Sequence, residues 1–270
     1  MKPGLAFSER IAFLREASYL AEPSISVERA RILTDFYRKN EGKYPVPVLR
    51  ALSFKELCTK QSIYIGDFEL IVGERGPGPK AVPTYPELTC HSEQDLRILN
   101  TRERQRYAVS EEDIRIYKEE IIPFWKGKTL REQIFSVLPT DWKDMYESGL
   151  FTEFAEQRAP GHTALDGKIY KYGMKDFRRR IAGVLSALEG DEDPESIRKR
   201  EMLQAMDIAC EALVIFAQRH ADLAREMAGD CMARGDVMRA RELEGIADVC
   251  MRVPANAPAT YREALQMYWF

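Results

Sequence analysis

The chain has 270 residues, of which 45% are hydrophobic and 31% are charged, as in a soluble globular protein with enough apolar residues for a core. Its 40 basic and 43 acidic residues are interspersed and give a net charge of −3, which argues against a nucleic-acid-binding face. No apolar run reaches the ~20 residues of a membrane-spanning helix, and MKPGLAFSER becomes charged too early for a secretory signal, so we expect a cytoplasmic protein without a membrane partner.

The first sixty residues are expected to be helical, with two helices that the apolar pattern marks. The segments 9–22 (ERIAFLREASYLAE) and 26–39 (SVERARILTDFYRK) repeat apolar residues every three or four positions, as amphipathic helices do. Pro23 separates the two helices, and Pro45 and Pro47 follow the second.

The next segment has a different pattern. Residues 62–79 (SIYIGDFELIVGERGPGP) are rich in the residue types that strands prefer, from Ile63 to Val72, and give the strongest strand signal in the chain. Residues 73–87 hold three glycines and four prolines, so they cannot be helical. This loop lacks the Gly-Lys-Ser/Thr ending of a phosphate-binding loop, and we interpret it as a rigid surface crossing.

Helix-start signals dominate the rest of the chain. Ser92 and Ser110 each precede an acid by three residues, Thr129 with Glu132 forms a capping box, and Asp193 is an N-cap followed by proline. The helix that starts there is expected to bury one stripe of the following residues: Met202, Ala205, Met206, Ala209, Cys210, Leu213 and Phe216. A more polar helix is expected over 233–250, with one solvated face.

The last residues, VPANAPATYREALQMYWF, begin a helix with Thr260 and Glu263 and stop on an aromatic cluster. Natural termini are usually polar and frayed. We therefore expect the sequence to be truncated inside a core helix.

Four segments together resemble the glycyl radical enzymes, the pyruvate formate-lyase-like superfamily. The segments are 67–87 (DFELIVGERGPGPKAVPTYPE), 119–134 (EEIIPFWKGKTLREQI), 151–163 (FTEFAEQRAPGHT) and 258–270 (PATYREALQMYWF). Their order resembles the N-terminal part of that family over essentially the whole chain. Within the family they are most similar to the branch that dehydrates trans-4-hydroxy-L-proline, and related members act on glycerol or sulfonated diols.

The resemblance implies a mainly α chain with a few β strands, in which residues 1–270 are the N-terminal portion of a ten-stranded α/β barrel domain. It implies that no cofactor is bound directly: a partner radical-SAM activase places a radical on a backbone glycine, and a cysteine carries it to the substrate. Further implied partners are the small-molecule substrate, the remaining C-terminal part and a second copy in a homodimer. Hydroxyproline would give pyrroline-5-carboxylate.

The residues that would carry the radical are missing from this chain. The family's cysteine is followed two positions later by glutamate, and none of the five cysteines has glutamate there; Cys210-Glu211 is off by one. The family's glycine loop reads R-V-x-G-Y, and its nearest approximation, 180–184 (RIAGV), lacks the tyrosine and lies in a helical pattern. We expect this polypeptide alone to be inactive, with no catalytic residue of its own.

Two residues are expected to contact the substrate. By the motif match, His162 corresponds to a histidine that faces the substrate and Phe154 to an aromatic residue that lines the pocket. Pro160 and Gly161 fix an unusual backbone path beside His162, which suits an imidazole aimed at a ligand. Glu153, Glu156 and Arg158 are interpreted as surface ion-pair residues.

Other residues are expected to have structural roles. His91 and His220 are interpreted as solvated or capping, and Trp125 and Trp142 as packed in the core or between helices. The five scattered cysteines predict reduced thiols, and no metal site is expected.

Three readings of function remain. The first is the N-terminal part of a hydroxyproline dehydratase, and the second keeps the superfamily but changes the substrate to a diol, a sulfo-diol or a keto acid, as in formate acetyltransferases. The third is a stand-alone helical interaction module, which disagrees with the apolar residues at the end of the sequence.

Overall fold

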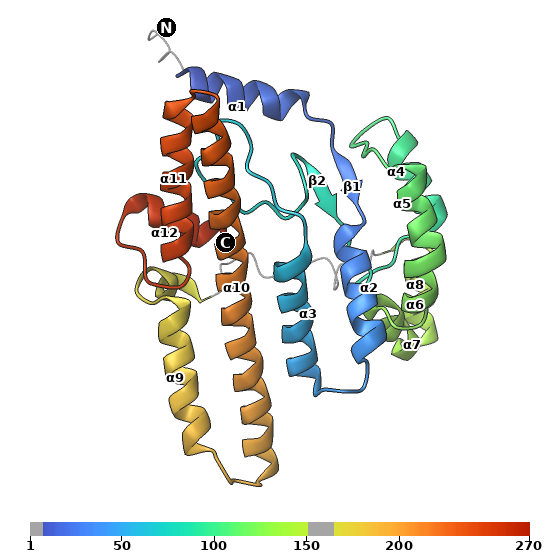
Figure 1. The fold of residues 1–270 in the computed structure, drawn as a ribbon. Helices are drawn as coiled ribbons and strands as arrows, with labels where there is room; N and C mark the ends of the chain where they lie inside the picture. Colours follow the sequence, from blue (N-terminus) through green and yellow to red (C-terminus); the bar gives the residue numbers. More distant parts are fainter. Residues whose placement is uncertain (1–7, 151–164) are drawn as a thin grey trace, which may run out of the picture. The chain divides into compact units, whose positions relative to one another are not determined.

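The computed structural model describes residues 8–150 and 165–270 and is shown in Figure 1. Its described residues form two compact units, one from 8–22, 39–81 and 165–270 and the other from 23–38 and 82–150. The chain is mainly helical with two short strands, as the sequence predicts. Among the described helices, none is long and apolar enough to cross a membrane.

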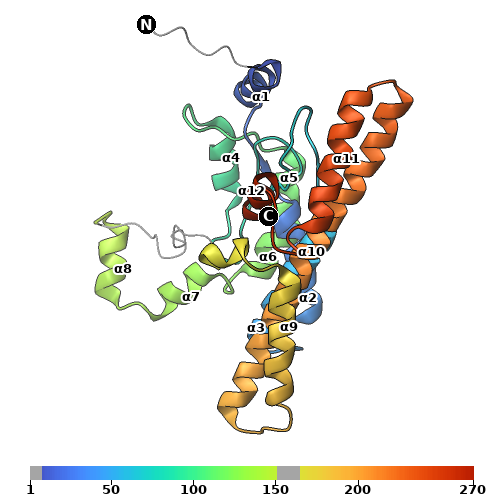
Figure 2. The same cartoon turned by 90° about the vertical axis from the view of Figure 1, so that its left-hand side faces the viewer.

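The first unit is organised around α10 (Pro194–Ala233), a helix of 40 residues. Its start was predicted: the Asp193 carboxylate accepts from the N–H of Glu195 at 3.0 Å and Pro194 takes the first helical position. Figures 1 and 2 show α9 beside one half of α10 and α11 beside the other. The helices of this unit are α1 (Glu9–Leu20), α3 (Val46–Lys60), η2 (Asp166–Tyr170), α9 (Met174–Ala187), α11 (Val237–Arg252) and α12 (Tyr261–Trp269).

Small side chains let the neighbours of α10 approach closely. Ala221, Ala224 and Ala228 are buried on α10 and share one core cluster with Leu243 and Ile246 of α11. The α11 helix has one buried and one exposed face, as predicted for 233–250.

The predicted stripe on α10 is only partly buried. Ala205 and Phe216 lie in the core, but Met202 and Met206 are 52% and 46% exposed, so their assignment to the core is wrong. Three-and-four spacing shows which residues share a face, and it does not show that another element covers the whole length of a 40-residue helix.

The second unit is built from shorter elements. Its core cluster includes Leu96, Tyr117, Ile121 and Trp125, which are all nearly or fully buried. The Trp125 Nε1 donates to the Thr34 hydroxyl at 2.8 Å, so the predicted core role of Trp125 is confirmed. The elements are β1 (Ser24–Ser26), α2 (Glu28–Asn40), β2 (Ala81–Pro83), α4 (Glu93–Thr101), α5 (Glu111–Ile116), η1 (Tyr117–Ile121), α6 (Ile122–Trp125), α7 (Leu130–Val137) and α8 (Thr140–Glu147), with β1 paired to β2.

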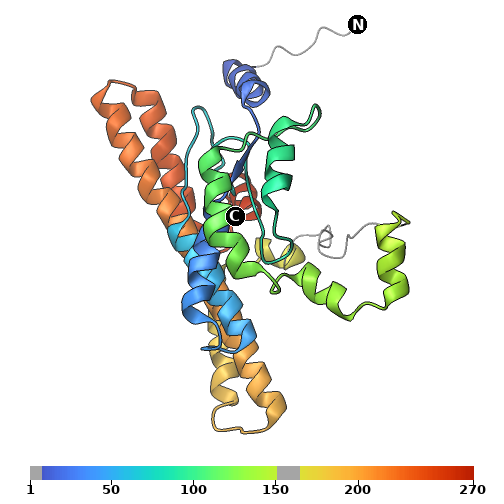
Figure 3. The same ribbon diagram turned by 90° about the vertical axis from the view of Figure 1, so that its right-hand side faces the viewer.

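The α7 and α8 helices have no buried residue and extend away from α4 to α6 in Figure 3. Trp142 on α8 is 51% exposed, so its predicted packed position is wrong. An aromatic residue buries its ring only where another element covers it, and the described residues leave this one half open.

The predicted strand over 63–72 is also wrong, since no residue there pairs as a strand. Ile65 and Val72 are nonetheless buried, so the apolar pattern marked residues that pack against α10 and α11. Residues with high strand propensity are those whose side chains fit a half-buried surface. A β-strand also needs a neighbouring strand to accept its backbone hydrogen bonds. We call residues 61–73 the extended segment.

Candidate functional site

The two residues predicted to contact substrate, Phe154 and His162, fall in 151–164, outside the described residues. The same holds for Glu153, Glu156 and Arg158. Their predicted roles therefore stay predictions. The described residues show instead how the chain places the segments that carry the other motifs.

Among the described residues, no strand pairs with the extended segment. Side chains from three helices hold it instead. Arg219 on α10 donates to the carbonyl oxygens of Cys58 and Gln61 at 2.9 and 2.8 Å. Arg239 on α11 donates to those of Glu69 and Gly66 at 3.0 and 2.9 Å. A charged donor makes a strong hydrogen bond to a carbonyl, so the two arginines fix this backbone at its start and in its middle.

Gln266 on α12 completes the attachment. Its Oε1 accepts from the Val72 N–H at 3.0 Å and its Nε2 donates to the Val72 carbonyl at 2.6 Å, and both residues are about 1% exposed. The side-chain amide thus pairs with Val72 as a neighbouring strand would. Val72 leads directly into the glycine-rich loop at 73–87.

At two glycines of this loop, a side chain would collide with neighbouring atoms. Gly73 has φ +120°, and a Cβ there would lie 3.0 Å from the Phe270 ring. A Cβ on Gly76 would lie 2.0 Å from the Ala81 carbonyl oxygen, which no side chain tolerates. The loop is not helical, as predicted, but Gly76, Thr84 and Pro86 are buried, so the interpretation as a surface crossing is only partly right.

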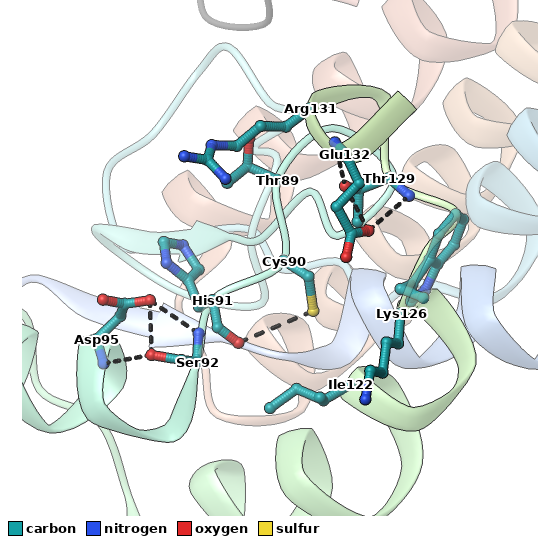
Figure 4. Close-up of a pocket in the computed structure, with 11 residues that line it drawn as sticks. Thr89, Cys90, His91, Ser92, Asp95, Ile122, Lys126, Thr129, Arg131 and Glu132 are labelled. Atoms are coloured by element: carbon teal, nitrogen blue, oxygen red, sulfur yellow. Dashed lines mark hydrogen bonds between the residues drawn. The ribbon is translucent and has the colours of Figure 1, made fainter. Parts of the chain in front are cut away.

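The second unit contains a pocket of about 590 Å³ that lies where two helices begin (Figure 4). We call it the α4–α7 pocket. It is lined by Thr89, Cys90, His91, Ser92, Asp95, Ile122, Trp125, Lys126, Thr129, Arg131 and Glu132. The cap residues Ser92 and Thr129 were predicted as helix starts, but nothing in the local sequence indicated that the two starts share a pocket.

Each carboxylate of the α4–α7 pocket caps its own helix. Asp95 accepts from the Ser92 N–H and hydroxyl, both at 2.8 Å. One oxygen of Glu132 accepts from the N–H of Gly127 at 3.0 Å and from the Thr129 hydroxyl at 2.8 Å. Burial acts to raise the pKa of Glu132, but these hydrogen bonds outweigh it and hold the pKa below its usual value.

The thiol of this pocket is unactivated, and its imidazole is kept in the neutral form. Burial, and secondly the charge of Glu132, raises the pKa of Cys90 to about 12. Burial lowers the pKa of His91 against the opposing effect of Asp95, so its charged form is disfavoured. The residue is half-buried, so its interpretation as solvated is only partly right. The described part of the pocket therefore offers no activated nucleophile.

A metal centre finds no support in the described residues. Nowhere in 8–150 and 165–270 do three or more His, Cys, Asp or Glu side chains gather as metal ligands would. The five cysteines are free thiols, as predicted. RIAGV at 180–184 lies within α9, so the helical conformation predicted for this segment is confirmed.

Comparison with known proteins relates this chain to one family. The pyruvate formate lyase-like family model matches residues 6–270. The trans-4-hydroxy-L-proline dehydratase of Clostridioides difficile is 47% identical over 97% of this chain and 33% of its own length. The crystal structure of hydroxyproline dehydratase from the same organism, with trans-4-hydroxy-L-proline bound, matches with a TM-score of 0.91 and 46% identity, over 98% of this chain and 33% of that one.

The B12-independent glycerol dehydratase of Clostridium butyricum, in its glycerol-bound form, is a more distant structural match. Its TM-score is 0.90 at 28% identity, over 100% of this chain and 34% of that one. The chain thus spans about a third of the length of the relatives it matches. The family match covers nearly every residue, and the fold and the resembling segments agree with it, so this chain belongs to the pyruvate formate lyase-like glycyl radical enzymes.

Proposed function

We propose that residues 1–270 are the N-terminal third of a glycyl radical dehydratase that removes water from trans-4-hydroxy-L-proline to give pyrroline-5-carboxylate. The reaction would need the remaining two-thirds of the protein, which would hold the radical cysteine and glycine. A radical-SAM activase would install the radical, and the complete enzyme would act as a cytoplasmic homodimer. The 270-residue chain alone would be inactive.

The identity to hydroxyproline dehydratase carries this choice of substrate. At 47% over nearly the whole chain, it is well above the 28% to the glycerol dehydratase, although the two solved structures match this fold almost equally well. Because both dehydratases share the fold of this chain but differ in sequence identity to it, the substrate is assigned from the sequence identity and not from the fold.

His162 and Phe154 would be the chain's contribution to the substrate pocket. An imidazole can hold a hydroxyl or a carboxylate and move a proton near neutral pH, and both steps suit the loss of a hydroxyl group as water. Phe154 would cover the apolar face of the proline ring. The α4–α7 pocket would take no part in this reaction, because its thiol is unactivated and its carboxylates cap helices.

A hybrid enzyme tests the proposal. Residues 1–270 replace the matching N-terminal third of the C. difficile dehydratase, and the hybrid is activated without oxygen and assayed for pyrroline-5-carboxylate. We expect turnover of trans-4-hydroxy-L-proline and a glycyl radical signal in electron paramagnetic resonance. His162→Gln should lower kcat/KM by about 10²-fold with the radical signal intact. A hybrid that carries the radical but leaves hydroxyproline unchanged would contradict the substrate assignment.

The second candidate is glycerol or another diol, favoured by the structural match to the glycerol dehydratase. The same hybrid is assayed with glycerol and propane-1,2-diol beside hydroxyproline. The control is the unmodified C. difficile enzyme, activated in parallel. Turnover of a diol faster than hydroxyproline would establish this second reading.

A further inference from the structure

Two side chains of the first unit bury nitrogen atoms that have no hydrogen-bond partner among the described residues: His220 on α10 and Arg262 on α12. His220 is fully buried, which corrects its interpretation as a solvated or capping residue. Burial lowers the pKa of this imidazole, so His220 meets its apolar surroundings in the neutral form. A guanidinium cannot lose its proton in a protein, so Arg262 stays charged wherever it lies.

Arg262 lies in the first turn of α12 and its guanidinium packs on α11. Its Nη1 would be 3.1 Å from a Cβ placed on Gly245, so the guanidinium occupies space that this glycine leaves open. Its Nε and Nη2 are buried. Burial raises the pKa of the Cys250 thiol to about 12, and the nearby positive charge of Arg262 acts against that rise. The charge is therefore held between α11 and α12, close to the apolar core that contains Cys250.

The acidic residues of α11 and α12 leave Arg262 unpaired. Glu263 accepts from Arg252 at 2.9 Å and from the Ala259 N–H at 2.6 Å, and Asp248 on α11 is exposed. In the part of the chain that the structure describes, no ion pair or hydrogen bond involves Arg262. A cation in the first turn of a helix also opposes the helix dipole, so its position on α12 adds to the cost.

We propose that Arg262 is the docking residue for a carboxylate from the part of the complete enzyme that lies outside residues 1–270. The inference rests on the proposed function, in which this chain is one third of a glycyl radical dehydratase. Its structural basis is a permanent charge with two buried, unpartnered nitrogen atoms and no anionic partner among the described residues. Taking a charge out of water without a partner is costly, and a carboxylate offsets that cost because it accepts from the N–H groups of a guanidinium and balances its charge.

The surroundings of Arg262 fit contact with another part of the enzyme. The residue is half-buried, so part of its side chain still faces out of the described chain. Tyr261 and Leu265 on the same helix are 81% and 41% exposed and lie one turn apart on one face. Apolar residues beside a charged pair exclude water once a second surface covers them. Because the chain spans about a third of the length of the relatives it matches, the remaining two-thirds can supply that surface.

Amide hydrogen exchange over residues 261–269 tests the docking, in the 270-residue chain and in the complete hybrid with the C. difficile remainder. In the 270-residue chain, Arg262→Met should leave the protection equal or higher, because it removes an unpaired buried charge. In the hybrid, the same variant should lower the protection about tenfold, because the carboxylate loses its partner. Arg262→Gln is measured in parallel, so that one variant can fail to fold without loss of the test. The matched control is Arg241→Met, which removes an exposed cation of α11 and should change neither value.

Three results would overturn the proposal. Protection that falls equally in the 270-residue chain and in the hybrid would place the anion within residues 1–270. Protection that stays unchanged in the hybrid would show that no carboxylate docks on Arg262. A tenfold loss with Arg241→Met as well would mark a general response to lost positive charge.

The docking and the proposed function fail separately, because the exchange measurement does not depend on turnover. A hybrid that leaves hydroxyproline unchanged but shows the Arg262 difference would refute the substrate assignment alone. A hybrid that converts hydroxyproline without that difference would refute the docking alone.

Discussion

Replacing Gln266 by leucine should destabilise the 270-residue chain strongly, because Gln266 satisfies a buried peptide unit that has no strand partner. The variant keeps the size of the side chain but leaves the Val72 N–H and carbonyl unpaired in a site about 1% exposed. Each unsatisfied buried group costs about 1–3 kcal/mol, so the loss should be about 2–6 kcal/mol. Domains are stable by only about 5–15 kcal/mol, so the effect should be easily measured.

The assay is urea unfolding followed by circular dichroism, with hydrogen exchange at Val72 as the local readout. Gln218→Leu is the matched control, because Gln218 is an exposed glutamine on α10 and its change should stay within about 0.5 kcal/mol. A loss below about 0.5 kcal/mol for Gln266→Leu, with unchanged exchange at Val72, would refute the claim that this side chain replaces a strand.

Three further predictions concern the same unit. Arg239→Met removes the donors to Gly66 and Glu69 and should cost about 2–4 kcal/mol in urea unfolding, whereas Arg241→Met, at an exposed position, should be nearly neutral; equal losses would contradict the anchoring role. Gly76→Ala should cost about 1–3 kcal/mol because its Cβ meets the Ala81 carbonyl, whereas Gly78→Ala has open space, and thermal unfolding of the pair decides the point. Cys58 and Cys250, whose pKa burial raises to about 12, should resist iodoacetamide at pH 8 and react only in urea; rapid labelling of the native chain would show that they are accessible.

Local signals predicted the helix starts well. Ser92, Ser110, Thr129 and Asp193 all cap helices as their spacing indicates, because an N-cap needs only its own first turn. The Thr260 hydroxyl likewise accepts from the Glu263 N–H, but the Glu263 carboxylate turns to Ala259 and Arg252 instead of closing a box. Local pattern specifies the start of a helix more reliably than the full set of its contacts.

Features that need a distant partner were not predictable. The strand signal from Ile63 to Val72 was wrong because the partners of this backbone are side chains of Arg219, Arg239 and Gln266, far along the chain. His220 sits between polar neighbours in the sequence, yet α3 and α12 bury it. Burial of a single residue is set by tertiary packing, which periodicity describes only in part.

The candidate site also has parts that the sequence predicts and parts that it does not. The family was predictable because four segments carry it in order, and the comparisons confirm it. His162 and Phe154 rest on that motif alone. The α4–α7 pocket was not predicted, since it forms only when two helix starts separated by 37 residues, Ser92 and Thr129, come together.

The most direct test of the central claim is the rate at which the activated hybrid, with residues 1–270 in place of the native N-terminal third, converts trans-4-hydroxy-L-proline compared with glycerol. The claim predicts pyrroline-5-carboxylate at a rate well above that of any glycerol product. A hybrid that bears the glycyl radical and prefers glycerol, or converts neither substrate, would contradict it.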